Sequence, residues 1–317
     1  MSSTLELPRA RLVRFAWFNV VFNLFVIMWG AFVRATGSGA GCGDHWPTCN
    51  GEVIPRAPAV ETMIELTHRV TSGGALILSV VLAVWAWRLW PKGSAVRRAT
   101  AATVFFMFVE AAVGAMLVLL KMTGDNDTMA RAMVMGVHLV NTLLLIGAMV
   151  LSAWLAGGRP MPRVSTDRVA AGLLGVALVG MLVLGASGGI TALGDTLFPA
   201  ESLAEGLAED LSPTAHLLIR LRVFHPMLAI LVAAYTAVVA LNIGLSKGAL
   251  ARRFTYALVG LMGLQVVVGS VNVVLLAPVW IQLIHLLMAD LVWISLVCLA
   301  AEVLTPAPAA RFGAAGG

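Results

Sequence analysis

Eight long apolar runs are the feature of this sequence that most constrains its fold. A helix needs about 20 apolar residues to cross about 30 Å of hydrocarbon. Runs of this kind occupy residues 15–33, 70–90, 100–120, 132–156, 169–190, 223–245, 254–276 and 281–303. Because 60% of the 317 residues are hydrophobic and only 12% are charged, the chain lacks the polar surface of a soluble globular protein. We therefore expect an all-α membrane protein with eight transmembrane helices.

Basic residues predict the orientation, since loops rich in Lys and Arg stay in the cytoplasm. Such residues gather before the first run, at Arg311, and in the loops 88–98, 159–168 and 247–253. The alternate loops carry mostly acidic residues and are expected outside: 34–67, 121–131 and 191–219. Both termini are therefore predicted to be cytoplasmic. The net charge of +5 follows from this topology, so it gives no reason to expect a nucleic-acid partner.

The two halves of the chain resemble each other at an offset of about 155 residues, which is typical of a duplicated helical unit. The similarity is carried by "GAFVRATGSG" (30–39) with "GASGGITALG" (185–194), and by "EAAVGAMLVLL" (110–120) with "QVVVGSVNVVLL" (265–276). We expect two pseudo-symmetric four-helix bundles, formed by residues 1–160 and 161–317.

Four histidines recur at equivalent places in this repeat. His68, His138, His225 and His285 each lie near the outer start of an even-numbered span. A single membrane histidine is more often a hydrogen-bonding residue, but chance hydrogen bonders need not recur in a repeat. Ionisable groups within a membrane usually mark a site, and neutral imidazole is a preferred ligand of heme iron. Two histidines facing each other in each bundle therefore predict two heme sites.

Heme propionates are carboxylates, which arginine binds well. Arg69 adjoins His68, while Arg220 and Arg222 lie just outside His225. These three arginines are candidates for propionate binding. The alternative, solvated arginines at a helix end, is equally compatible with each of them.

Acidic residues distinguish the two halves. Glu65 lies three residues before His68 on the same helical face, where the second half has Arg222. A carboxylate beside a heme can orient a bound group, shuttle a proton or stabilise developing positive charge, so Glu65 is the candidate catalytic residue. Glu110 is a second intramembrane carboxylate, opposite neutral Gln265 in the repeat, and it either lines a cavity or forms structural hydrogen bonds.

Two cysteines lie in the first outer loop, in "GCGDHWPTCNG" (41–51). Thiols on an oxidising face pair, so we expect a disulfide between Cys42 and Cys49. The covalent heme motif Cys-x-x-Cys-His is not present there. A zinc site formed by both cysteines and His45 is the alternative, although its ligand spacing is unusual.

These motifs together resemble the heme A synthase family, whose members convert heme O to heme A for cytochrome oxidases. The resemblance covers essentially the whole chain and is carried by "VRATGSGAGCGDHWPTCNG" (33–51), by "ELTHR" (65–69) and by one histidine in each even-numbered span. Cys42 and Cys49 match the first-loop cysteine pair of the family. The second pair that some members carry has no counterpart in 191–219, so electron exchange between two cysteine pairs is not expected.

The resemblance implies a role for each site residue. His225 and His285 would hold a resident heme B, while His68 and His138 would bind the substrate heme O on either side, next to the acidic Glu65. The implied reaction oxidises a heme methyl group, through an alcohol and its hydrate, to a formyl group. The implied partners are a heme O synthase, cytochrome oxidase assembly factors and an electron acceptor that the sequence does not identify. We expect the inner membrane of a bacterium, with the hemes near its outer face.

Two other classes of protein remain open at this point. A di-heme B membrane cytochrome that only transfers electrons would use the same four histidines but would not need Glu65. A transporter or a quinone- or heme-handling assembly factor is the third class. Each half has four spans, which gives both repeats the same topology and disfavours an inverted-repeat transporter.

Overall fold

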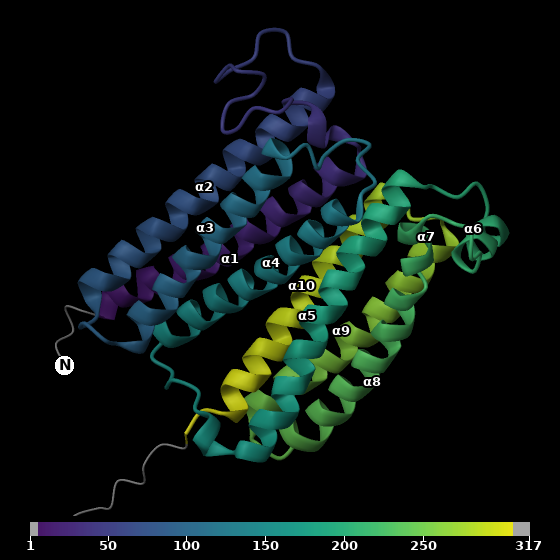
Figure 1. Cartoon of the computed structure of the whole chain (residues 1–317). Helices are drawn as coiled ribbons and strands as arrows, with labels where there is room; N and C mark the ends of the chain where they lie inside the picture. Colours follow the sequence, from purple (N-terminus) through teal and green to yellow (C-terminus); the bar gives the residue numbers. More distant parts are fainter. Residues whose placement is uncertain (1–5, 307–317) are drawn as a thin grey trace, which may run out of the picture.

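The computed structural model describes residues 6–306 and is almost entirely helical (Figure 1). Its long helices are α1 (Glu6–Ala35), α2 (Val60–Leu89), α3 (Ala95–Leu119), α4 (Met129–Ala156), α5 (Arg168–Leu197), α8 (Phe224–Gly244), α9 (Ala249–Val274) and α10 (Val279–Val303). The short helices are η2 (Ser38–Ala40), η3 (Val164–Thr166), α6 (Leu203–Asp210) and α7 (Leu217–Leu221). Within the described residues, eight spans are long and apolar enough to cross a membrane, α7 and α8 forming one of them. The predicted all-α membrane fold is confirmed.

Several helices extend beyond the predicted apolar runs, and two of these extensions bear on the site. Helix α2 begins at Val60, ten residues before the predicted start at 70, and α5 continues to Leu197, past the predicted end at 190. Both extra segments carry polar side chains, such as Glu65 and Asp195, which lower hydropathy without breaking a helix. His68 consequently lies within α2 and not at its first turn.

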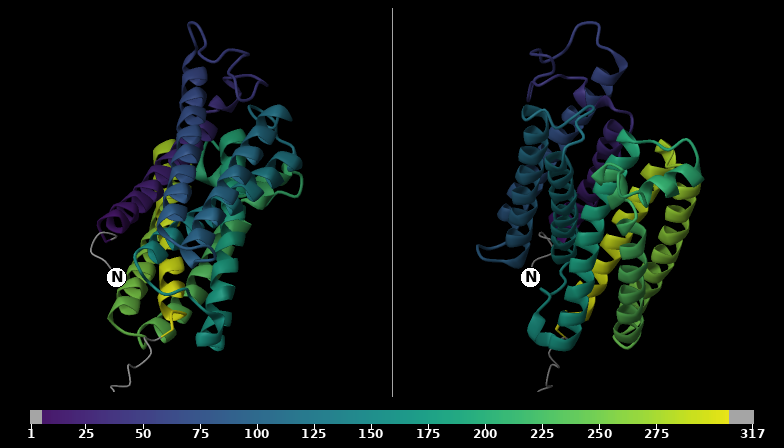
Figure 2. Two further views of the ribbon diagram at one scale, coloured as in Figure 1. Left: turned by 90° about the vertical axis from the view of Figure 1, so that its left-hand side faces the viewer. Right: turned by 45° about the vertical axis from the view of Figure 1, so that its right-hand side comes forward.

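The long helices pack as two rings of four (Figures 1 and 2). In the first ring α1 contacts α2, α2 contacts α3, α3 contacts α4, and α4 contacts α1. The second ring is formed in the same way by α5, α8, α9 and α10. The rings meet where α1 and α4 pack against α5 and α10. The pseudo-symmetry of the two rings, and a division into domains near residue 160, stay predictions.

Specific side chains join the two rings. The guanidinium group of Arg34 on α1 donates to Ala192 O at 2.6 Å on α5 and to Gln282 Oε1 at 2.9 Å on α10. Deeper in the junction, the indole of Trp293 donates to Leu143 O at 2.6 Å. In each of these hydrogen bonds the donor and the acceptor lie more than 140 residues apart in sequence. The bonds therefore join the two rings to each other, and not two helices of the same ring.

The loop at 36–59 and the short helices α6 and α7 lie at one end of the molecule, the upper end in Figure 1. The loops 90–94 and 245–248 lie at the opposite end, where α1 begins and α10 ends. Which end faces the cytoplasm stays a prediction. The predicted cytoplasmic termini, with Arg311, lie outside the described residues.

Candidate heme-binding sites

The helices are packed less tightly at the level of the histidines than below it. In α4, nearly every residue from Asn141 onward is buried, whereas the turns around His138 are mostly half-exposed. In α10, the buried stretch begins at Asp290, one turn below His285. At the end of the rings near the outer loops, the side chains of α4 and α10 are therefore less completely buried than at the opposite end.

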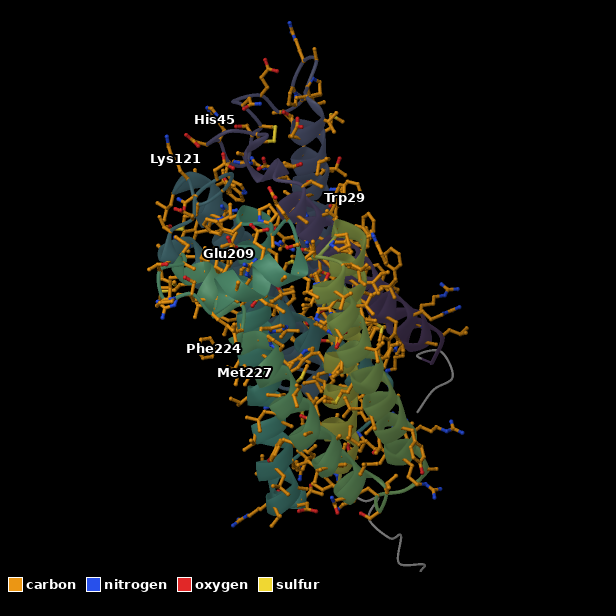
Figure 3. The ribbon with its side chains drawn as sticks, turned by 90° about the vertical axis from the view of Figure 1, so that its right-hand side faces the viewer. Trp29, His45, Lys121, Glu209, Phe224 and Met227 are labelled. Atoms are coloured by element: carbon orange, nitrogen blue, oxygen red, sulfur yellow. A yellow bond between two sulfur atoms is a disulfide. The ribbon has the colours of Figure 1, made fainter. Side chains whose placement is uncertain are left out.

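In the second ring, His225 and His285 face each other. Their ring centres are 6.4 Å apart and their planes are inclined by 81°. Two imidazoles that bind one iron through nitrogens about 2 Å from the metal bring their ring centres about 6 Å apart. His225 and His285 thus have the spacing of two axial ligands of one heme. Phe224 and Met227, beside His225 on α8, project outward from the helix (Figure 3).

The neighbours of these two imidazoles differ, because that of His225 contacts Nδ1 and that of His285 donates to Nε2. Ser187 donates its only hydroxyl hydrogen to Leu184 O at 2.8 Å and lies 3.0 Å from His225 Nδ1. With the hydroxyl hydrogen directed at Leu184, the serine oxygen accepts from Nδ1 in the tautomer of His225 whose Nε2 carries the free lone pair. Gln265 Nε2 lies 3.3 Å from His285 Nε2, while His285 Nδ1 is buried without a partner among the described residues.

Glycines lie opposite three of the four histidines. A Cβ atom placed on Gly188 would lie 3.0 Å from His225 Cε1, and one on Gly269 would lie 2.9 Å from His285 Cε1. In the first ring, a Cβ on Gly30 would lie 2.8 Å from His68 Cε1. Each glycine therefore lets an imidazole lie directly against the neighbouring helix, which keeps the ring orientation fixed.

The first ring brings His68 and His138 to the same end of the molecule. His68 Nδ1 is buried without a hydrogen bond within residues 6–306, and His138 Nδ1 has Glu110 Oε1 near it at 3.5 Å. A buried polar atom without a hydrogen bond is costly in an apolar environment, which favours a binding role for His68. The orphaned nitrogens, the glycine contacts and the histidine spacing together fit heme.

Glu110 lies beside His138, as Gln265 lies beside His285. Its carboxylate accepts hydrogen bonds from Asn141 Nδ2 at 2.6 Å and Thr142 Oγ1 at 2.5 Å, and Oε1 lies 3.5 Å from His138 Nδ1. The first ring thus has a carboxylate where the second has an amide. Both suggested roles of Glu110, in a site and in structural hydrogen bonds, stay open.

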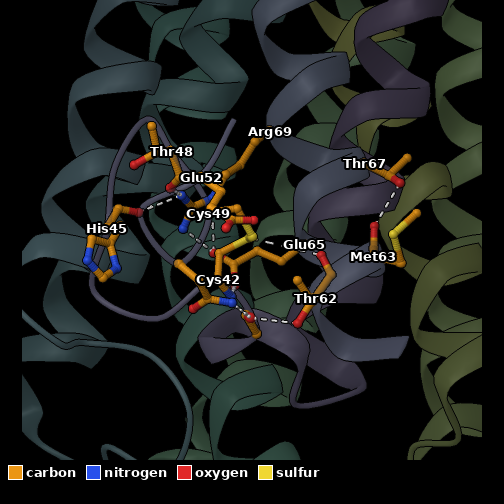
Figure 4. The surroundings of a disulfide bond; sticks show 12 residues. Cys42, His45, Thr48, Cys49, Glu52, Thr62, Met63, Glu65, Thr67 and Arg69 are labelled. Atoms are coloured by element: carbon orange, nitrogen blue, oxygen red, sulfur yellow. Dashed lines mark hydrogen bonds and ion pairs between the residues drawn. A yellow bond between two sulfur atoms is a disulfide. The ribbon is translucent and has the colours of Figure 1, made fainter. Parts of the chain in front are cut away.

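Glu65 is 4% exposed and joins α2 to the first outer loop (Figure 4). Its Oε2 accepts the backbone N–H of Cys42 at 2.8 Å, and its Oε1 accepts from Arg69 Nη2 at 2.5 Å. Arg69 Nη1 in turn donates to His45 O at 2.6 Å and Thr48 O at 2.7 Å. The catalytic candidate therefore sits one helical turn from His68, in a network that holds the loop.

The first outer loop is closed by a disulfide between Cys42 and Cys49, and both cysteines are fully buried. The expected pairing is thus present, and the alternative zinc site is wrong because both sulfur atoms are bonded to each other. A positive φ angle at Gly43 (62°) lets the chain turn within so short a ring, and a second at Gly51 (83°) turns it just beyond. At the loop surface, Asp44 accepts from Lys121 and raises the pKa of that amine.

The other propionate candidates differ in exposure. Arg222 donates to Asp210 Oδ1 at 2.9 Å, to Asp195 Oδ1 at 3.4 Å and to Phe198 O at 3.1 Å. Like Arg69, it holds the outer loop that precedes its own helix. Arg220 is exposed. Propionate binding by Arg69, Arg220 and Arg222 stays a prediction. Most donors of Arg69 and Arg222 are used by the loops, but Arg222 Nη2 is buried without a hydrogen bond among the described residues.

Sequence reasoning missed several residues of this site. Ser187 was not singled out, because one serine in an apolar run has no motif. Gly30 and Gly269 lie within the segments that match in the internal repeat, so the repeat itself could have marked them. Arg34, which joins the rings, follows an apolar run and is indistinguishable there from an ordinary interfacial arginine.

The fold and the paired histidines define a multi-span membrane protein with the features of a heme-binding helical bundle. The chain belongs to the cytochrome oxidase assembly protein family (COX15-CtaA), whose family model matches residues 13–297. The resemblance to heme A synthases seen in the sequence is confirmed by two of its relatives. Heme A synthase of Alkalihalophilus pseudofirmus is 54% identical over 65 residues, 20% of this chain and 22% of that protein. Heme A synthase of Bacillus cereus is 39% identical over 102 residues, 31% of this chain and 33% of that protein.

A longer match carries a different name. Protoheme IX farnesyltransferase of Thermus thermophilus is 47% identical over 296 residues, which are 93% of this chain but 49% of that protein. The chain thus spans about half the length of the first relatives that it matches.

Proposed function

We propose that this chain acts as a heme A synthase, oxidising a methyl group of heme O to the formyl group of heme A for cytochrome oxidase. The observation that carries the proposal is the asymmetry between two otherwise similar histidine pairs. Glu65 lies one helical turn from His68 and Glu110 Oε1 lies 3.5 Å from His138 Nδ1, while His285 has the amide of Gln265 at the place of Glu110. One pair is thus suited to chemistry and the other to holding a resident group.

In this proposal the second ring, within 161–317, holds a heme B through His225 and His285. Bound there, heme B supplies reversible one-electron chemistry. Ser187 fixes the tautomer of His225 and orients its ring, as a hydrogen-bonding partner of a metal ligand generally does. Gln265 restrains His285 without adding charge.

The first ring, within 1–160, receives heme O between His68 and His138. Glu65 lies one helical turn from His68 and acts as the acid-base or charge-stabilising group during methyl oxidation. The network of Arg69 and Cys42 keeps its carboxylate in place. Glu110 orients His138.

The surroundings follow from the same proposal. The histidine end of the rings faces outside, the termini are cytoplasmic, and the membrane is the inner membrane of a bacterium. A heme O synthase delivers the substrate, assembly factors receive the product, and an electron acceptor completes the oxidation. The farnesyltransferase name of the Thermus relative partly conflicts with this proposal; the match covers 49% of that protein.

Analysis of the pigments in the purified chain tests the proposal. Heme B together with heme O or heme A supports a synthase. Two heme B per chain, with no conversion of added heme O, would establish the rival di-heme cytochrome. Formation of heme O from heme B and farnesyl diphosphate by this chain alone would instead establish a farnesyltransferase.

A further inference from the structure

The end of the bundle opposite the histidines carries a groove that the proposed heme chemistry does not use. One pocket of about 270 Å³ lies among α1, α4, α9 and α10, and its lining includes Trp17, Trp154, Arg159 and Phe254. A second pocket, of about 280 Å³, lies beside the end of α2, and its lining includes Arg9, Ala10 and Trp90. Val13 and Gly157 line both pockets, so the two form one continuous groove at the junction of the rings.

Most of this groove is apolar. Its walls are the aromatic rings of Trp17 and Phe254, and its centre is formed by Val13, Ala153 and Gly157. Small residues at the centre leave room for an extended hydrocarbon chain. The indole of Trp90 lies at the end of α2, the depth at which tryptophan commonly marks the membrane interface.

Two cations lie along the groove, each stacked on an indole ring. The guanidinium carbon of Arg9 lies 5.2 Å from the ring centre of Trp90, and its Nε is buried without a partner among residues 6–306. The guanidinium carbon of Arg159 lies 4.3 Å from the ring centre of Trp154 and pairs only with Glu302 at 2.9 Å within that range. Stacking leaves the in-plane N–H groups of a guanidinium free to bind an anion such as phosphate.

We propose that this groove binds an anionic phospholipid of the bilayer, with its phosphate at Arg9 and Arg159 and an acyl chain along Val13 and Trp17. Basic pockets between transmembrane helices are suited to anionic lipid headgroups. Charge complementarity selects this occupant over a neutral quinone, which would fill the apolar part but leave the Arg9 Nε unpaired. Arg34 joins the two rings at the histidine end, and the lipid would join them at the opposite end.

The experiment uses the full chain, purified in detergent and stripped of lipid, then exposed to phosphatidylglycerol or phosphatidylcholine in mixed micelles. Bound lipid is counted by native mass spectrometry. We expect phosphatidylglycerol to be retained and phosphatidylcholine to be lost. Arg9→Gln should weaken retention about fivefold, the effect of one basic residue near a membrane surface. Arg97→Gln is the matched control, since Arg97 stacks on Trp87 at 5.5 Å but does not line the groove.

A second variant tests the apolar part with both arginines in place. Val13→Phe narrows the point shared by the two pockets and should displace the lipid, while an unchanged thermal unfolding temperature in lipid-free detergent shows that the fold is kept. Equal retention of the two lipids, or equal effects of Arg9→Gln and Arg97→Gln, would overturn the proposal. Displacement of phosphatidylglycerol by an isoprenoid quinone at equal concentration would overturn it as well.

Discussion

Glu65 Oε2 accepts the backbone N–H of Cys42 at 2.8 Å, so the carboxylate proposed for catalysis is in direct contact with the disulfide ring of the outer loop. The same carboxylate holds Arg69, which binds two carbonyl groups of that loop. The loop and the site near His68 therefore form one unit, and a change in either is expected to affect the other.

Glu65→Gln separates a chemical role of the carboxylate from a structural one. The amide keeps a hydrogen-bond acceptor but loses the charge, so we expect heme B to stay bound while heme A formation falls by about 10²–10⁴-fold, the usual contribution of a positioned acid-base group. Extracted hemes, separated by chromatography, give the measurement.

Thr62→Val is the matched control for this variant. Thr62 Oγ1 donates to Gly41 O at 2.8 Å and thus also joins the loop to α2, but without a carboxylate. A loss below about tenfold in Glu65→Gln, or an equal loss in Thr62→Val, would show that Glu65 acts only through the loop.

The disulfide should contribute to stability because it restricts the unfolded chain. Replacing Cys42 and Cys49 by Ser is expected to lower the free energy of unfolding by about 2–3 kcal/mol, as estimated from loop closure. Mass spectrometry after alkylation without reductant should find neither cysteine modified in native membranes. Stoichiometric labelling of both would contradict the pairing.

Ser187→Ala should weaken the resident heme without removing a ligand. Loss of a partner that orients a metal-bound histidine typically lowers affinity about 10–100-fold. We expect faster loss of heme B to a scavenging apoprotein, followed by its absorbance, and complete loss in His225→Ala. Ser270→Ala is the control, because Ser270 is exposed and its hydroxyl donates only to its own helix. Identical heme retention in the two serine variants would rule out the proposed tautomer control.

Glu110→Gln makes the first ring resemble the second at the residue beside the histidine. If Glu110 orients His138, this variant should bind added heme O about 10–100-fold more weakly and keep the heme B signal unchanged. Spectroscopic titration with heme O measures the first effect. Unchanged heme O affinity together with a lower unfolding temperature would assign Glu110 to structural hydrogen bonds with Asn141 and Thr142.

Hydropathy predicted the eight spans, and the histidine repeat selected the candidate residues that the structure places at one end of the rings. The length of an apolar run is a strong constraint in a membrane, because the backbone N–H and C=O groups there must form their hydrogen bonds within a helix. The start of α2 was missed because Glu61, Glu65 and Arg69 make its first turns polar although they continue the helix.

The contacts of the charged residues could not be predicted from the sequence. Arg69 and Arg222 were proposed to bind propionates, which stays a prediction, and their contacts with loop carbonyls and carboxylates were not foreseen. Those partners depend on how each loop folds back over its ring, and hydropathy carries no information about this.

Heme analysis of a bacterial host that makes heme O but has no other source of heme A tests the central claim most directly. With this chain expressed in its membrane, we predict that extracts contain heme A, and that the Glu65→Gln variant yields heme O or a partly oxidised alcohol instead. Heme O unchanged in amount, with no heme A and with heme B fully bound to the chain, would contradict the account.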